Sequence, residues 1–455
     1  MSVSGKGLLK RLDWLSILIF VLLIAIGWIN IYSSTYIEGQ ENIFDFSTVY
    51  GKQLLFIGLD IVLILVILAL ESTFFERFSS IIYIISLLLL LGLYVFGTTI
   101  AGATSWYNLG FFNLQPSEQA KVAAALAVAK YLSDIQTDIK RRKDQLYAFL
   151  ILLIPAILVI PQPDPGSALV FFSLVFVLFR EGIPIFYLGL GLFTILVFVC
   201  TLMFGTIWIA IVLGLIIALF LLLKKQSFKV PIIPAIGFFV ITVLFSLSVN
   251  FVFQNVFEQR HRDRFSLWLS LEKDPKKLEE IRKTIGYNTY QSEKAIESGG
   301  FFGKGFLEGT RTKGDFVPEQ HTDYIFSTVG EEWGFLGTTI VVILFTFLLL
   351  RLVYLSERQK NAFSRMYGYG VVSILLVHYF INIGMVIGVL PTIGIPLPFF
   401  SYGGSGLLGF TALLFIFLKM DSNRLKEGFY FQIFLLNHPE VFQKNQGPFC
   451  APLHQ

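Results

Sequence analysis

Long apolar segments alternate with shorter polar ones along almost the whole of this 455-residue sequence. A membrane-spanning helix needs about 20 mainly apolar residues. Segments that approach this length occur at residues 14–34, 51–70, 78–97, 117–132, 146–160, 167–179, 184–204, 206–223, 230–256, 333–354, 368–390 and 404–419. The pattern predicts an all-α polytopic membrane protein, a bundle of 10–12 transmembrane helices. The pair that flanks the Pro-rich break at 161–166 can also form one re-entrant or kinked element.

Composition supports this fold class. Hydrophobic residues make up 55% of the chain and charged residues 15%, with a mean hydropathy of +0.72, which is too apolar for a soluble domain. We therefore expect the chain to be in contact with membrane lipids. The net charge of only +4 gives no sign of a nucleic-acid partner. The two cysteines, Cys200 and Cys450, are too few for a disulfide framework.

Clusters of Lys and Arg recur in the short connections between the predicted spans. They are Lys6, Lys10 and Arg11; residues 140–143; Lys224, Lys225 and Lys229; Arg351, Arg358, Lys360 and Arg365; and Lys419, Arg424 and Lys426. An even number of spans separates them, so all five fall on one side of the membrane. The positive-inside rule makes that side the cytoplasm, with both termini there. We therefore expect a transmembrane domain at 1–427 with a large extracytoplasmic loop at 257–330, and a cytoplasmic tail at 428–455.

Acidic groups concentrate in DFVPEQHTDYIFSTVGEEWGFLG, residues 315–337, where a polar loop meets an apolar run. Charge held at a membrane boundary is costly and indicates a functional site. A second interpretation is that acidic residues in the first turn of a helix favour its dipole. That interpretation suits Glu331 and Glu332 better than the turn at 318–323.

Few polar residues interrupt the predicted spans. Glu118 and Lys121 are three residues apart and share a helix face, where they form a structural pair or face a substrate. Asp164 lies in the Pro-rich break and is a candidate without an assigned role. Isolated polar residues elsewhere fit satisfied interior groups: Asp60, His378 and Asn382.

Three further stretches lie outside the spans. Residues 274–283, DPKKLEEIRK, predict a short amphipathic surface helix. The glycine-rich stretch 299–305, GGFFGKG, either approaches a phosphate with its backbone or forms a flexible turn. The Pro- and Gly-rich stretch 390–406 predicts a non-helical lid over the bundle.

Six motifs follow one another along the chain: WYNLG with QPSEQAK (106–121), QPDPGSAL (162–169), QRHRDR (259–264), GYNTYQS with GGFFGKG (286–305), VPEQHTDYIF with GEEWG (317–334), and PLPFFSYGGS (396–405). Together they resemble the SEDS family, the shape, elongation, division and sporulation proteins that polymerise bacterial peptidoglycan. The resemblance covers nearly the whole chain. It is greatest to the elongation members, because division members usually carry a lysine where Ile393 stands.

The resemblance implies a peptidoglycan glycosyltransferase in the bacterial inner membrane, with an extracytoplasmic active site. The donor is the growing strand on undecaprenyl pyrophosphate, and the acceptor is lipid II. The implied partner is a class B penicillin-binding protein, a transpeptidase. Family members typically have ten spans. The two additional spans predicted here fit one extra helical hairpin near 184–223. Pro165 and Trp333 stand where leucine is commoner, and 271–284 resembles an insertion.

Asp323 matches the essential aspartate of that family, which implies the general base that takes a proton from the 4-hydroxyl of the acceptor. The leaving pyrophosphate needs cationic compensation, from a divalent ion (Mg²⁺ or Mn²⁺) or from basic side chains. The basic candidates are Lys121, paired with Glu118, and Arg262, Arg264 and Lys304. Asp315 and Glu319 either hold a metal or orient the acceptor, and His321 stabilises the turn. Trp106 either stacks on a sugar or anchors the interface.

Two rival functions fit the same composition. A flippase for a lipid-linked precursor also uses many spans, broken helices and internal charge, but it needs access from both faces. A non-catalytic scaffold that recruits other cell-wall enzymes is the second rival. The collection of polar motifs on one side of the membrane favours the glycosyltransferase.

Overall fold

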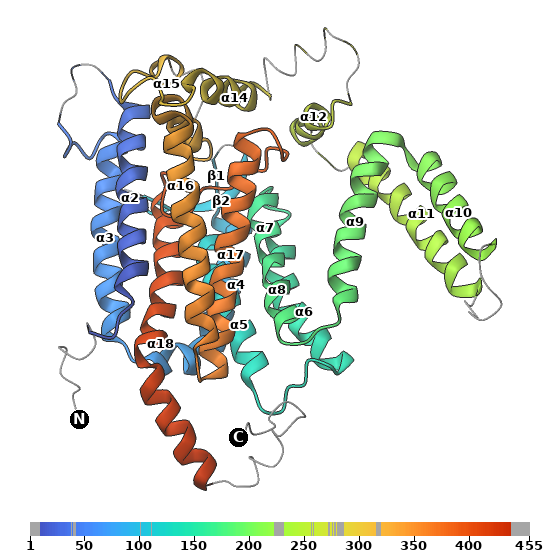
Figure 1. The fold of residues 1–455 in the computed structure, drawn as a ribbon, viewed down its shortest axis with the longest axis horizontal. Helices are drawn as coiled ribbons and strands as arrows, with labels where there is room; N and C mark the ends of the chain where they lie inside the picture. The colour runs from blue at the N-terminus through green and yellow to red at the C-terminus, as the bar shows by residue number, and fades with distance from the viewer. Residues whose placement is uncertain are drawn as a thin grey trace, which may run out of the picture.

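The predicted spans form helices throughout the part of the chain that the structure describes (Figure 1). In this computed structural model, that part is residues 10–437 without 38, 40–41, 101, 111, 223–231, 256, 258, 272–273, 275, 277–278, 280–285 and 315–319. Only the backbone is described at residues 260–261 and 425–437. The predicted surface helix at 274–283 therefore lies mostly outside the described residues.

Twelve helical segments correspond to the twelve predicted spans. They are α2 (Trp14–Thr35), α3 (Val49–Ala69), α4 (Ser72–Phe96), α5 (Pro116–Ser133), α6 (Arg142–Val159), α7 to α8 (Pro165–Arg180), α9 (Ile185–Phe204), α10 (Thr206–Leu222), α11 (Ile232–Asn255), α16 (Ile325–Glu357), α17 (Ala362–Val386) and α18 (Gly404–Asn437). Within the described residues, eight helices are long and apolar enough to cross a membrane. The all-α polytopic class is confirmed.

Helix α5 lies at the centre of the bundle although it is the least apolar of the long helices. Of its 18 residues, 14 are buried, and alanine is the commonest among them. Small side chains let neighbouring helices approach closely, and α4, α6, α17 and α18 all pack against α5. At Gly370 of α17, for example, an added Cβ would lie 3.2 Å from the Cβ of Ala125. The polar groups of α5 are thereby enclosed by protein.

The break at 161–166 separates two helices. α6 ends at Val159, and Asp164 caps α7 (Pro165–Phe171) by accepting a hydrogen bond from the backbone of Ser167 at 3.0 Å. A 3₁₀ turn, η1 (Phe172–Leu174), then joins α7 to α8 (Val175–Arg180). The segment at 165–180 is thus a broken helix packed on α6.

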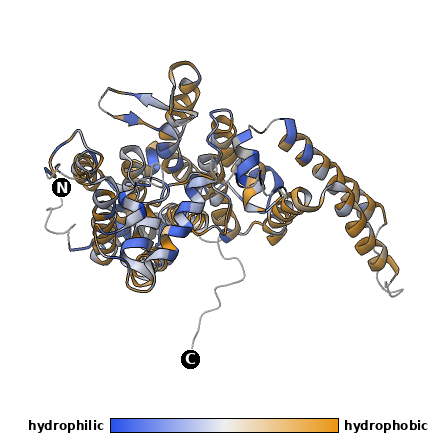
Figure 2. Ribbon diagram, turned by 90° about the horizontal axis from the view of Figure 1, so that it is seen from above, coloured by the Kyte–Doolittle hydropathy of each residue, from blue (hydrophilic) through white to orange (hydrophobic). Residues whose placement is uncertain are grey.

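Three helices, α9 to α11, extend to one side of the bundle and are hydrophobic over most of their surface (Figure 2). α10 has no buried residue, and α10 and α11 make their main contacts with each other and with α9. α9 still reaches the bundle, because Tyr187 donates a hydrogen bond to Gln145 of α6 at 2.7 Å. The most peripheral pair of helices is therefore α10 and α11. The extra hairpin was expected one helix earlier in the chain, at 184–223.

Polar elements gather at one end of the bundle, called here the loop end (Figure 1). They include α12 (Gln259–Trp268), α14 (Tyr287–Gly299), α15 (Thr310–Lys313) and a small antiparallel sheet. The sheet consists of β1 (Thr98–Ile100), β2 (Ala103–Asn108) and β3 (Asn113–Leu114), in the order β1-β2-β3. It was not predicted, because its strands are too short to give an alternating pattern.

The opposite end, called here the terminal end, is where α2 begins and where α16 and α18 arrive (Figure 1). The side chain of Arg351 on α16 donates to Asp13, which precedes α2, with an Nε–Oδ2 distance of 3.2 Å. Arg358, after α16, donates to Asp421 of α18 with an Nε–Oδ1 distance of 2.9 Å. These ion pairs place three of the predicted basic clusters together. α18 also continues through the expected domain boundary at 427 to Asn437.

Candidate active site

Asp323 stands at the loop end, in the turn that precedes α16. This helix begins at Ile325, not near Trp333 as the hydrophobic pattern predicted. The side-chain amide of Asn382 on α17 donates to the backbone oxygen of Asp323 at 2.8 Å and to that of Ile395 at 2.7 Å. The carboxylate lies against Gly394, where an added Cβ would be 3.4 Å from Oδ2. Asp323 is therefore held between two helices and the 387–403 connection, and its side chain is only partly buried.

Three hydroxyl groups meet beside Asp323. The Tyr324 oxygen lies 3.0 Å from Thr289 Oγ1 and 3.2 Å from Thr392 Oγ1, and the two threonine oxygens are 2.8 Å apart. Burial raises the pKa of Tyr324, outweighing the opposite effects of the two threonines and of the Arg264 charge. The phenol therefore stays neutral and can donate a hydrogen bond at physiological pH.

A cavity of about 190 Å³ adjoins this cluster, between α12, α14 and the segment 388–392. Arg264, Trp268 and Thr289 line it together with Glu293 and Thr392. The Trp268 indole donates to the backbone oxygen of Val389 at 2.9 Å, and Arg264 donates to that of Thr392 at 3.4 Å. A cation, a carboxylate, an aromatic ring and hydroxyl groups thus line one space, the kind of mixed lining that binds a polar ligand.

Glu118 and Lys121 form a second polar cluster deeper in the bundle. The Lys121 ammonium lies 2.7 Å from Glu118 Oε1 and 2.9 Å from His378 Nε2 of α17. The side chains of Lys121 and Glu118 are only 2% and 3% exposed. His378 and Asn382 are four residues apart on α17, so they lie on one face of that helix. One face of α17 therefore connects the buried ion pair to the backbone of Asp323.

The predicted cations occupy different places. Arg264 lines the cavity near Tyr324, whereas Arg262 donates to the backbone oxygen of Gln254 at 2.9 Å, toward α11. Lys304 is bound to Glu331 at 2.7 Å and to Thr310 at 2.8 Å. Among the four candidates, Arg264 is the one that lines this cavity.

The remaining predicted site residues are peripheral or lie outside the described part of the chain. Trp106 is partly buried in β2, paired with Thr98. The backbone oxygen of His321 accepts a hydrogen bond from the Tyr402 N–H at 2.9 Å, and their rings are 5.3 Å apart. His321 therefore ties the turn to the 387–403 connection. Asp315 and Glu319 lie outside the described residues.

Glu331 is a buried anchor for the loop that follows α14. Its carboxylate accepts hydrogen bonds from the Lys304 ammonium at 2.7 Å and from the backbone N–H groups of Arg311 and Thr312 at 3.0 and 2.9 Å. Glu332 is likewise buried, and it accepts a hydrogen bond from Ser33. Neither residue lies in the first turn of α16. The helix-dipole interpretation of this pair was wrong.

The glycine-rich stretch 299–305 packs on a kink in α16. At the kink, Gly334 has φ 65° and ψ −159°. The freed carbonyl oxygens of Glu331 and Glu332 accept hydrogen bonds from the N–H groups of Lys304 and Gly305, each at 3.0 Å. A Cβ at Gly303 would lie 2.0 Å from the Glu332 oxygen. The glycines permit this close approach of the two backbones. Two backbone N–H groups of this stretch therefore bind carbonyl oxygens of α16 and are not free to bind a phosphate.

No group of three or more His, Cys, Asp or Glu side chains suited to a metal ion occurs among the described residues. Because Asp315 and Glu319 fall outside them, the predicted divalent cation stays a prediction.

Comparison with known proteins places the chain in a family. It matches the family described as "Cell cycle protein" (FTSW_RODA_SPOVE) over residues 13–210 and 189–426. The chain belongs to this family. It is 33% identical to "Peptidoglycan glycosyltransferase MrdB" of Escherichia coli K12, over 81% of this chain and 84% of the relative. It is 31% identical to "Peptidoglycan glycosyltransferase RodA" of Treponema pallidum, over 90% and 97%.

Solved structures of the family share the fold. One, described as "Structural coordination of polymerization and crosslinking by a peptidoglycan synthase complex", aligns with a TM-score of 0.66 at 27% identity, covering 91% of this chain and 98% of that chain. The crystal structure of Thermus thermophilus "Rod shape determining protein RodA" aligns with a TM-score of 0.58 at 25% identity, covering 91% and 97%. The predicted SEDS membership with RodA-like character is confirmed, as is a multi-pass membrane protein.

Sequence reasoning did not single out several residues at this site. Trp268, Thr289 and Thr392 lie far apart in the sequence and meet only because α12, α14 and the 387–403 connection fold over the same end of the bundle. Thr289 lies within the GYNTYQS motif, which was the available signal. Asn382 was interpreted as an interior polar group, and it is one, but the backbone that it holds is that of Asp323.

Proposed function

We propose that this chain is a peptidoglycan glycosyltransferase that polymerises lipid II into glycan strands during cell-wall elongation. The observation that carries the proposal is the position of Asp323 at the loop end, directly before Tyr324, whose hydroxyl contacts two residues that line the Arg264 cavity, Thr289 and Thr392. The names of the MrdB and RodA relatives support the reaction. Their identities of 33% and 31% are slightly higher than the 26–29% to four FtsW relatives, which supports elongation over division.

In the proposed reaction, the 4-hydroxyl oxygen of the acceptor lipid II attacks the anomeric carbon of the donor strand. A new glycosidic bond forms as the bond to undecaprenyl pyrophosphate breaks. Asp323 accepts the proton from the attacking hydroxyl, which is general-base catalysis. The Arg264 guanidinium compensates the charge of the departing pyrophosphate. Asn382 on α17 positions the backbone of Asp323. Divalent Mg²⁺ or Mn²⁺, if bound, would supply further charge compensation.

The proposed orientation places the terminal end in the cytoplasm and the loop end outside. Lys10, Arg11, Arg358 and Arg424 collect at the terminal end, and the positive-inside rule supports this assignment. A class B penicillin-binding protein is the proposed partner. The related solved structure that describes coordinated polymerization and crosslinking supports such a complex.

The decisive experiment compares two activities of the purified chain in proteoliposomes. Fluorescent lipid II is supplied with and without the transpeptidase partner and with divalent cations or a chelator. Glycan polymer is measured on gels, and transbilayer movement of lipid II is measured by dithionite quenching. We expect polymer that depends on the chain. Lipid II movement without polymer would favour the flippase, and equal polymer from the partner alone would favour the scaffold.

A further inference from the structure

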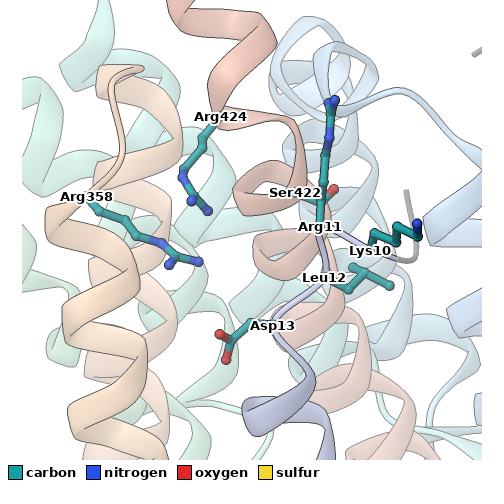
Figure 3. A pocket seen from close by; sticks show the side chains of 7 residues that line it. All are labelled: Lys10, Arg11, Leu12, Asp13, Arg358, Ser422 and Arg424. Carbon is teal, nitrogen blue, oxygen red and sulfur yellow. The ribbon is translucent and has the colours of Figure 1, made fainter. Parts of the chain in front are cut away.

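A second cavity, of about 270 Å³, lies at the terminal end, away from the candidate active site (Figure 3). Its cationic lining residues are Lys10, Arg11, Arg358 and Arg424. In Figure 3, Arg358, directly after α16, and Arg424 of α18 extend toward the space beside Asp13, and Lys10 and Arg11 stand across from them. Three segments distant in sequence therefore bring cations to one cavity.

Positive charge exceeds negative charge in and around this cavity. Asp421 is fully buried and is shared, because Arg358 Nε lies 2.9 Å from its Oδ1 and Arg424 Nη1 lies 3.4 Å from both of its oxygens. Asp13 forms an ion pair with Arg351, whose Nε lies 3.2 Å from Asp13 Oδ2. With Lys10 and Arg11, five cations face two carboxylates that are already paired. An anion is the ligand that this balance favours.

Two exposed aromatic side chains lie next to residues that line this cavity. Trp14, the first residue of α2, and Tyr354, in the last turn of α16, are each 57% exposed. Tryptophan and tyrosine concentrate at the membrane–water interface. The guanidinium carbons of Arg351 and Arg358 lie 5.2 and 5.7 Å from the centre of the Tyr354 ring. The aromatic side chains thus mark the interface beside the basic cavity.

We propose that this cavity binds the phosphodiester head group of an anionic phospholipid. Guanidinium groups bind phosphate oxygens through paired, charge-assisted hydrogen bonds. Basic pockets between transmembrane helices at the membrane surface are suited to anionic head groups. The bound lipid bridges the start of α2 to the end of α16 and to the middle of α18. This assignment is independent of the reaction proposed above, because the two sites are at opposite ends of the bundle.

The test measures lipid retained by the full-length chain. Protein reconstituted in mixed phosphatidylglycerol and phosphatidylcholine is extracted in mild detergent, and bound lipid is counted by native mass spectrometry. We expect wild type to retain phosphatidylglycerol over phosphatidylcholine. Arg424→Gln should lower its apparent affinity about tenfold, the cost of one charge-assisted hydrogen bond. This variant leaves the Arg358 pair with Asp421, and a Lys10→Gln/Arg11→Gln variant removes charge without touching either buried carboxylate.

The matched control is Arg141→Gln in the α5–α6 connection. Arg141 is 69% exposed and does not line the cavity, so retention should be unchanged. Equal retention of phosphatidylglycerol by wild type and both cavity variants would overturn the proposal. The basic cluster would then serve only to orient the chain in the membrane. A separate arm titrates inorganic phosphate. Displacement of phosphatidylglycerol by phosphate at comparable concentration would assign the site to a free phosphate instead of a lipid.

Discussion

The Nζ atom of Lys121 lies 2.9 Å from Nε2 of His378, and this contact joins α5 to α17 in the interior of the bundle. Glu118 completes the cluster at 2.7 Å from the same ammonium. A buried ion pair costs several kcal/mol in desolvation and persists only when its groups are well paired. Through His378 the pair contacts α17, the helix whose Asn382 binds the backbone of Asp323.

Removing Lys121 should destabilise the protein. Lys121→Met leaves Glu118 buried without its cation, and breaking a buried pair costs about 3–5 kcal/mol. Glu118→Leu with Lys121→Met should recover part of that loss in a double-mutant cycle of thermal unfolding in detergent. The control is Lys130→Met, since its pair with Glu76 is 3.5 Å long and 42% exposed at the lysine. Normal folding and normal polymerisation by Lys121→Met would contradict this prediction. The Glu118–Lys121 pair would then only fill space in the bundle.

Replacing the proposed base should abolish most of the activity. For Asp323→Asn, the rate of lipid II polymerisation should fall by a factor of about 10²–10⁴, the usual contribution of general-base catalysis. Size-exclusion profiles should stay like wild type, because the bond from Asn382 goes to the backbone. Glu297→Gln, a 68% exposed carboxylate on α14, is the matched control. A wild-type rate for Asp323→Asn would remove this residue from the mechanism.

Glu331 should control the order of the loop between α14 and α16. In Glu331→Gln the amide cannot accept from all of the donors that now surround the carboxylate. Loss of the buried pair with Lys304 should speed hydrogen exchange at residues 300–314 by about 10²-fold. The exposed Lys313→Gln in α15 serves as the comparison. Unchanged exchange in Glu331→Gln would mean that other contacts hold the loop.

The kink at Gly334 should not tolerate a side chain. An alanine Cβ there would lie 2.3 Å from the Gly303 nitrogen, and φ of 65° with ψ of −159° is unfavourable for any other residue. Gly334→Ala should therefore lower the midpoint of thermal unfolding. The backbone strain alone should cost about 1–3 kcal/mol of unfolding free energy. Gly58→Ala in α3 is the control, since nothing lies within 4 Å of an added Cβ. Equal midpoints for the two variants would contradict this account of the kink.

The pair at the terminal end should give a pH-dependent contribution to stability. Burial raises the pKa of Asp13, but hydrogen bonds from Arg351 and Ser16 outweigh it and hold the pKa below its usual value of 3.8. Such a group adds stability above its unfolded pKa and loses it as pH falls through the folded pKa. Wild type should therefore be more stable than Asp13→Asn at neutral pH, and the gap should close below pH 3.8. A gap that is constant between about pH 7 and about pH 3 would refute this.

The sequence determined the architecture, because burial in a bilayer demands about 20 apolar residues per span and restricts basic clusters to one side. Its VPEQHTDYIF motif also predicted Asp323 as the candidate general base, through the family resemblance. It misplaced the start of α16, since residues 325–332 are helical but include the polar pair at Glu331 and Glu332. Only the tertiary structure showed that Arg264, and neither Arg262 nor Lys304, lines the cavity beside Tyr324. Such choices depend on which distant segments pack together, and spacing along one chain does not encode that contact.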